Sequence, residues 1–239
     1  MPPLPLPLHD ALALGWFFVC WAGYSYYADH SRWGTRELAS ILHDYRLRWM
    51  TRMLGRDNRI ADAAIVAALL RSNNLFTTTT LFILAGLVTV LGTIDRAREV
   101  AEGLFFIAPA AREVWEIKFM ILIGIFVYAF FKFAWSLRQF NFSLVLVGSA
   151  PMPDEPAAPD RADFAARAAM LVTRASSSFN RGQRAYAFGL AALAWFIQPL
   201  ALAFAAIWVV LVLYRRDCRS VTLATLADPV TEKGERLPK

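Results

Sequence analysis

Residues 117–135, IKFMILIGIFVYAFFKFAW, decide the fold of this chain. The stretch carries charge only at Lys118 and Lys132, and every other position is apolar, aromatic or glycine. An α-helix rises about 1.5 Å per residue, so about 20 apolar residues cross the ~30 Å hydrocarbon core of a bilayer. The stretch therefore predicts a transmembrane helix.

Three further apolar stretches predict membrane spans, at residues 11–27, 75–93 and 185–214. The last is too long for one untilted span and is interrupted by Gln198-Pro199, so it forms either one tilted helix or a hairpin of two short helices. We predict an all-α fold, an integral membrane helical bundle of four to five transmembrane helices that forms a single domain over residues 1–239.

Arginine and lysine between the spans predict the orientation. Residues 29–72 hold eight Arg and residues 136–184 hold six, whereas residues 94–116 hold three Arg against five acids. Because basic connections stay in the cytoplasm, the N-terminus is predicted to be periplasmic and the main loops cytoplasmic. The basic tail after Tyr214 returns to the cytoplasm only if the last stretch is a hairpin, which favours five crossings.

The N-terminal residues MPPLPLPLHD contain no Lys or Arg, which predicts a retained helix instead of a cleaved signal. The chain is 57% hydrophobic with a net charge of +6. Its basic residues lie beside the spans, so we expect anionic membrane lipids as partners and no nucleic acid. These features predict a multi-pass protein of the bacterial inner membrane.

Three cytoplasmic segments are predicted to be interfacial amphipathic helices, at about residues 36–54, 58–70 and 160–184, the last after a Pro-rich linker at 151–159. Alternatively, the apolar face of 160–184 packs on the helices of the first loop. The arginines predicted to contact anionic lipids are Arg46, Arg52, Arg167, Arg174 and Arg181.

The sequence predicts no catalytic residue, no cofactor and no metal site. It contains no nucleophile elbow, HExxH, P-loop or dinucleotide fingerprint, and no metal-ligand spacing around its two cysteines. His9 and His30 flank one predicted span, so they cannot both bind one haem within the bundle. An enzyme is thus disfavoured, with His43 beside Asp44 the remaining candidate at the interface.

Polar residues at the ends of the spans form a candidate intramembrane polar site. Lys132 either snorkels to the surface or points inward toward an anionic ligand. The stretch 140–150 is either an extended helix end or a re-entrant piece. The candidate residues are Asn73, Asn74, Lys132, Arg138, Gln139 and Asn141.

Several stretches resemble a known family. They are LLRSNNLFTTTTLFILAGL at 69–87, WEIKFMILIGIFVYAFFK at 115–132, FAWSLRQFNFSLVLVGSAP at 133–151 and the C-terminal block at 185–216. They are similar to the DUF599 family of multi-pass membrane proteins. The resemblance implies a mostly bacterial membrane protein with no established activity, and it supplies no functional residues.

The lack of a catalytic constellation and the 18 Phe and 8 Trp favour a protein-contact role. We expect an accessory, assembly or scaffold subunit of a membrane complex, with other membrane subunits or a second copy as partners. An oligomeric transporter or channel for a small solute or ion is the alternative. A membrane enzyme or cofactor carrier is the third hypothesis.

Overall fold

A computed structural model describes residues 6–30, 35–103, 110–155 and 161–218. Over these residues the fold is all-helical, as predicted, with seven α-helices, one 3₁₀ turn and no strand. The elements are α1 (Leu8–His30), α2 (Thr35–Leu54), α3 (Ile60–Gly92), α4 (Ile94–Glu102), α5 (Arg112–Gly148), α6 (Arg161–Ala192), η1 (Leu193–Phe196) and α7 (Pro199–Cys218).

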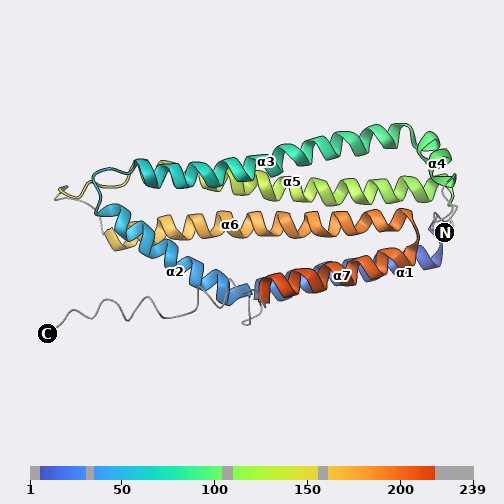
Figure 1. The fold of residues 1–239 in the computed structure, drawn as a ribbon, viewed down its shortest axis with the longest axis horizontal. Helices are drawn as coiled ribbons and strands as arrows, with labels where there is room; N and C mark the ends of the chain where they lie inside the picture. The colour runs from blue at the N-terminus through green and yellow to red at the C-terminus, as the bar shows by residue number, and fades with distance from the viewer. Residues whose placement is uncertain (1–5, 31–34, 104–109, 156–160, 219–239) are drawn as a thin grey trace, which may run out of the picture.

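Three long helices run the length of the molecule as antiparallel rods. Helices α3, α5 and α6 contain 33, 37 and 32 residues, or about 50 Å each. Helices α1 and α7 lie beside one end of these rods, and α2 crosses the other end obliquely (Figure 1). The rods are therefore longer than the hydrocarbon core of a bilayer.

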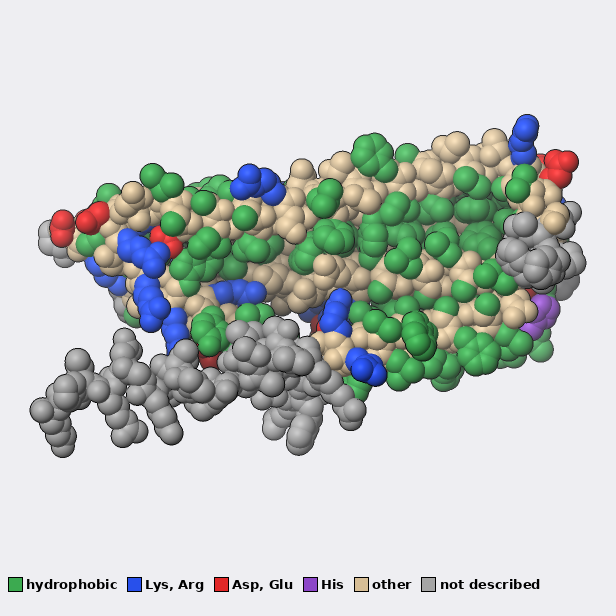
Figure 2. Space-filling model, in the orientation of Figure 1, with side chains coloured by type: hydrophobic (Ala, Val, Ile, Leu, Met, Phe, Trp, Pro, Cys, Tyr) green, Lys and Arg blue, Asp and Glu red, His purple; other side chains and the backbone are tan. Residues whose placement is uncertain are grey.

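The two ends of the rods differ in surface chemistry. Hydrophobic side chains cover most of the visible surface around α1 and α7, while Lys and Arg side chains gather over the end that α2 crosses (Figure 2). We call these the apolar half and the basic half. The apolar half comprises residues 8–27, 75–92, 117–135 and 185–214, and the basic half comprises residues 35–54, 60–74, 136–148 and 161–184.

Helices α5 and α6 pack through large side chains on α5 against small residues on α6. A Cβ atom added at Gly182 would lie 2.6 Å from Phe133 Cε1, and one at Gly189 would lie 3.0 Å from Phe126 Cζ. Both pairs are spaced by seven residues on both helices, so they face each other along one seam. Glycine thus allows the phenyl rings to contact the α6 backbone directly.

The apolar half has an aromatic core. Phe17, Phe188 and Trp195 are at most 1% exposed. The ring of Phe188 lies edge-on to Phe17 at 5.8 Å and stacks on Trp21 at 5.9 Å between centroids. Side chains of α1, α5, α6 and η1 therefore fill the centre of this half, and aromatic contacts stabilise it.

Three helices are long and apolar enough to cross a membrane, namely α3, α5 and Pro199–Asp217 of α7. The four to five spans predicted from the sequence are therefore not confirmed. Helix α1 includes the predicted span at 11–27 but is not among these three helices. Helix α6 includes only the first part of the stretch at 185–214.

Helix boundaries differ from those predicted for the loops. The predicted interfacial helix at 58–70 and the span at 75–93 are one helix, α3, because no Gly or Pro interrupts residues 60–85. Likewise, α5 continues to Gly148, so the stretch at 140–150 is mostly an extended helix end. The Thr and Asn residues within α3 do not interrupt the helix, because their side chains donate hydrogen bonds to backbone carbonyls.

The segment predicted as an interfacial helix at 160–184 is the first part of α6, which continues without a break to Ala192. Its apolar face packs on α2, which agrees with the alternative prediction that this face contacts the helices of the first loop. Ala168 and Val172 are buried in one cluster with Met50 and Met53. The chain then reverses direction between η1 and α7, at the predicted Gln198-Pro199 turn (Figure 1).

Candidate functional site

A pocket with both polar and apolar lining residues lies where the apolar half meets the basic half. Its volume is about 450 Å³, and helices α1, α2, α6 and α7 form its walls. We call it the boundary pocket. Its lining residues are Ala28, Asp29, Leu38, Ala39, Leu42, Ser177, Asn180, Gln183, Arg184, Arg216 and Asp217.

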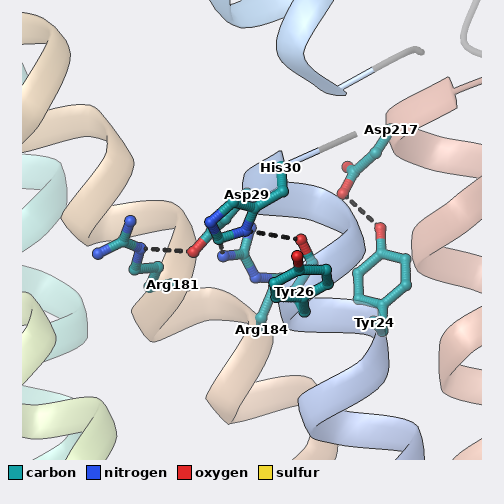
Figure 3. Close-up of polar contacts among 7 residues, drawn as sticks. All are labelled: Tyr24, Tyr26, Asp29, His30, Arg181, Arg184 and Asp217. Atoms are coloured by element: carbon teal, nitrogen blue, oxygen red, sulfur yellow. Dashed lines mark hydrogen bonds and ion pairs between the residues drawn. The ribbon is translucent and has the colours of Figure 1, made fainter. Parts of the chain in front are cut away.

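An ion-pair cluster forms one wall of the boundary pocket (Figure 3). Arg184 Nη2 donates to Asp29 Oδ1 at 2.7 Å, and Arg181 Nε lies 3.1 Å from Asp29 Oδ2. Positions 181 and 184 share one face of α6 because they are three residues apart. The Arg184 side chain is 8% exposed, so its charge is largely desolvated and the pair with Asp29 compensates for that cost.

The ends of α1 and α7 are joined at the opposite wall. Tyr24 Oη donates to Asp217 Oδ2 at 2.7 Å, and Arg216 Nε donates to Asp217 Oδ1 at 2.8 Å. Figure 3 shows Tyr24 and Asp217 meeting between the two helices. His30 stacks on Tyr26 of its own helix, with ring centroids 4.4 Å apart. Of these residues Arg216 and Asp217 line the pocket, and the bond between Tyr24 and Asp217 joins α1 to α7 beside it.

Several polar groups in the pocket remain available to a ligand. Within the described part of the chain, the side chains of Ser177, Asn180 and Gln183 make no hydrogen bond. The Nε of Arg184 has no acceptor among the described residues either, but this atom is fully buried. Both carboxylates face internal donors, so the open groups of the lining are the hydroxyl of Ser177 and the amides of Asn180 and Gln183, each of which can donate or accept a hydrogen bond.

A second polar contact between α2 and α6 adjoins the pocket. His43 Nδ1 lies 3.0 Å from Thr173 Oγ1. Arg46 donates to Thr173 Oγ1 at 3.3 Å and to Ser176 Oγ at 3.1 Å. Burial lowers the pKa of Arg46. Arg46 was predicted to contact lipid, but its side chain lies between α2 and α6 and bonds to α6.

The other arginines predicted to contact lipid are largely on the surface. Arg52, Arg167 and Arg174 are exposed. Arg167 pairs with Asp163 on its own helix at 3.0 Å. Arg181 is half-exposed while it pairs with Asp29. Their contact with anionic lipid stays a prediction.

Two members of the predicted intramembrane polar site are buried. Asn73 Nδ2 donates to the Phe133 carbonyl at 3.2 Å, which joins α3 to α5. Gln139 is buried on α5. The Oδ1 of Asn73 and the Oε1 of Gln139 have no donor within the described residues.

The remaining members do not join them. Asn74, Arg138 and Asn141 are exposed, and Lys132 is half-exposed. Lys132 Nζ lies 5.1 Å from the centroid of the Tyr128 ring, a cation–π distance. The six residues therefore do not form one cluster, because successive positions on a helix point in different directions.

A buried charge cluster at the far end of the apolar half escaped the sequence analysis. Trp195 Nε1 donates to Asp10 Oδ1 at 2.6 Å, and Lys118 Nζ donates to the Trp195 carbonyl at 2.8 Å. Lys118 Nζ also lies 3.9 Å from Asp10 Oδ1. The signal in the sequence was an acid and a base at the same predicted depth, Asp10 before the first span and Lys118 early in the third.

A second buried carboxylate joins α2 to α3. Asp62 is completely buried, and its Oδ1 accepts hydrogen bonds from Trp49 Nε1 at 2.7 Å and Arg56 Nη1 at 2.8 Å. No pattern in the sequence distinguished Asp62 from an exposed helix residue, since Ala neighbours it on both sides. This contact fixes the turn between the two helices.

Across the described ranges, no group of three or more His, Cys, Asp or Glu side chains could hold a metal ion. The boundary pocket offers hydrogen bonds and charge, which are features of a binding site.

Comparison with protein families identifies the chain. A family model described as "Protein of unknown function, DUF599" matches residues 12–222. The chain belongs to the DUF599 family. The match includes every residue that lines the boundary pocket, and it confirms the resemblance seen in the sequence. No curated protein and no solved structure matches the chain.

Proposed function

We propose that this DUF599 protein is a multi-pass protein of the bacterial inner membrane that serves as an accessory, assembly or scaffold subunit of a membrane complex. Three helices apolar enough to cross a membrane support the membrane part of this proposal. The apolar half has a suitable length, since the 23 residues of α1 extend about 35 Å, close to the ~30 Å hydrocarbon core plus part of the interface.

The charge distribution supports a basic half in the cytoplasm. In this arrangement α1, the second half of α3, the first half of α5, the end of α6 and α7 each cross the bilayer, giving five crossings and a periplasmic N-terminus. The Asp29 ion pairs and Arg216 then lie at the cytoplasmic interface, where guanidinium groups meet phosphates.

The closed aromatic interior is the observation that carries the scaffold proposal. Phe17, Phe126, Phe188 and Trp195 fill the centre of the apolar half, and all are buried. A solute needs a polar or hydrated path, and these rings leave none through the described interior of one protomer. The outer faces of four helices instead expose large aromatic side chains, namely Trp16, Phe82, Phe131, Trp135, Phe204 and Trp208.

One observation favours the oligomeric transporter or channel. Lys132 is half-exposed on α5 within the apolar half, and Asn74, Arg138 and Asn141 are exposed in the adjoining basic half. Polar side chains on an outer face could line a path only if several copies enclosed it. This alternative therefore requires a defined homo-oligomer.

Native mass spectrometry separates the two functions. The full chain, expressed at its natural level and extracted in a mild detergent, should be recovered in stoichiometric amounts with unrelated membrane subunits. Trp135→Ala and Trp208→Ala form a matched pair, because both side chains are more than half exposed, on α5 and α7 respectively. Loss of the partner in one variant would identify the contacting helix.

Recovery of the chain alone, as a defined homo-oligomer, would contradict the scaffold proposal. Flux assays in vesicles with Arg138→Ala would then test the transport alternative. Reporter fusions at Arg219 test the five crossings, since a periplasmic tail is incompatible with them.

A further inference from the structure

The boundary pocket has two chemically different walls. Leu38, Ala39 and Leu42 of α2 form an apolar wall, while α6 contributes Ser177 and a run of polar side chains. A volume of about 450 Å³ falls in the range that holds a small molecule or a lipid headgroup. The pocket therefore suits a ligand with one polar and one apolar end.

The charges of the pocket favour an anion. Both oxygens of Asp29 and of Asp217 already face internal donors. Two arginines of the lining, Arg184 and Arg216, meet these two carboxylates, and Arg181, which pairs with Asp29 from outside the lining, brings one further positive charge to the cluster. An anionic group would balance that charge without displacing an internal bond.

The open donors suit an oxyanion with several oxygen atoms. Asn180 and Gln183 carry amide N–H groups and Ser177 a hydroxyl, and all three are without an intramolecular bond in the described structure. Arg216 uses only its Nε on Asp217, and its side chain is half-exposed. A guanidinium fork beside amide and hydroxyl donors is the arrangement that binds phosphate oxygens.

We propose that the boundary pocket binds the phosphate group of a phosphate ester, with Arg216, Asn180, Gln183 and Ser177 as its donors. The ester has two sources: the headgroup of an anionic phospholipid, or a soluble phosphate ester. The donor set is independent of the proposed function. Only the phospholipid headgroup as the source of the phosphate rests on the proposed function, because that source requires the apolar half to lie in the bilayer.

Binding is measured on the full-length protein in a maltoside detergent, which contains no phosphorus. The probes are glycerol 3-phosphate and phosphatidylglycerol in mixed micelles, and the readout is the thermal unfolding midpoint as a function of probe concentration. Arg216→Gln should weaken binding about tenfold or more, because it removes a charge-assisted hydrogen bond. Arg215→Gln removes the same charge from the neighbouring residue, which lies outside the lining, and should change affinity less than about twofold.

A second pair of variants guards against misfolding. Asn180→Ala breaks no internal bond, so it should weaken binding while the ligand-free midpoint stays unchanged. Its control is Asn141→Ala, an exposed asparagine on α5 away from the pocket. Stabilisation by glycerol 3-phosphate identifies a soluble ester, and stabilisation by phosphatidylglycerol alone identifies a lipid headgroup. Equal effects of Arg215→Gln and Arg216→Gln, or no stabilisation by either probe, would overturn the proposal.

Discussion

Gly182→Ala tests the close approach of α5 and α6. The added Cβ would lie 2.6, 2.8 and 2.9 Å from three atoms of the Phe133 ring. Carbon atoms pack at about 3.5–4.0 Å, so the ring would have to move by roughly 1 Å. Phe133 is completely buried and in ring contact with Phe76 and Phe179, which leaves it little room to do so.

Two opposing free energies set the size of the effect. Overpacking a buried site costs about 1–3 kcal/mol, whereas Ala is favoured over Gly within a helix by about 1 kcal/mol. Gly86→Ala isolates the second effect, because no atom lies within 4 Å of a Cβ at that position of α3. The difference between the two variants should therefore be about 1–3 kcal/mol, with Gly182→Ala the less stable.

Thermal unfolding of the full-length protein in detergent measures this difference. For a chain of this size, each kcal/mol corresponds to about 2–4 °C in Tm. The double variant Gly182→Ala, Phe133→Leu should recover part of the loss attributed to Gly182→Ala, because the smaller side chain makes room for the methyl group. An equal Tm for Gly182→Ala and Gly86→Ala would refute the close packing described for the seam.

Three further substitutions test the buried polar contacts by the same assay. Asp10→Asn should lower the free energy of unfolding by about 3 kcal/mol, because it leaves the Lys118 ammonium buried without its carboxylate. The exposed control Asp163→Asn should lower it by less than about 1 kcal/mol. Similar losses for the two variants would contradict the pairing of Asp10 with Lys118. Asp62→Asn should lower the free energy of unfolding by about 1–3 kcal/mol, since a buried neutral amide is a weaker acceptor for the Trp49 and Arg56 donors, and an unchanged Tm would show that the carboxylate is not needed. Asn73→Ala should lower the free energy of unfolding by about 1 kcal/mol because it removes the hydrogen bond that joins α3 to α5; a gain in stability would contradict a stabilising role for this bond.

Local sequence was sufficient for the helical class and for the strongest spans. Residues 117–135 and 75–93 predicted two apolar helices, and both lie in helices long and apolar enough to cross a membrane. The turn at Gln198-Pro199 was one of the two alternatives that the sequence left open, because proline interrupts a helix. The boundaries of α3 and α6 could not be predicted from the sequence, since a change from polar to apolar composition does not by itself end a helix.

The candidate site was largely hidden from the sequence. Arg181 was identified for its spacing on an amphipathic helix, yet its partner Asp29 lies 152 positions away in the chain (181 − 29). Asp217, which meets Tyr24, is farther still. Pairs this distant depend on which helices become neighbours, and hydrophobic periodicity does not encode that choice.

The sequence by itself determined that this protein is a basic, strongly apolar, helical chain with long aromatic-rich segments. These properties follow from composition and local periodicity, which act within a few helical turns. Tertiary structure alone decided that α3, α5 and α6 run unbroken through both halves, that glycines on α6 accept the phenyl rings of α5, and that a donor-rich pocket forms between four helices. The reason is that burial and ion pairing depend on neighbours distant in the chain, and only packing of the whole bundle brings those neighbours together.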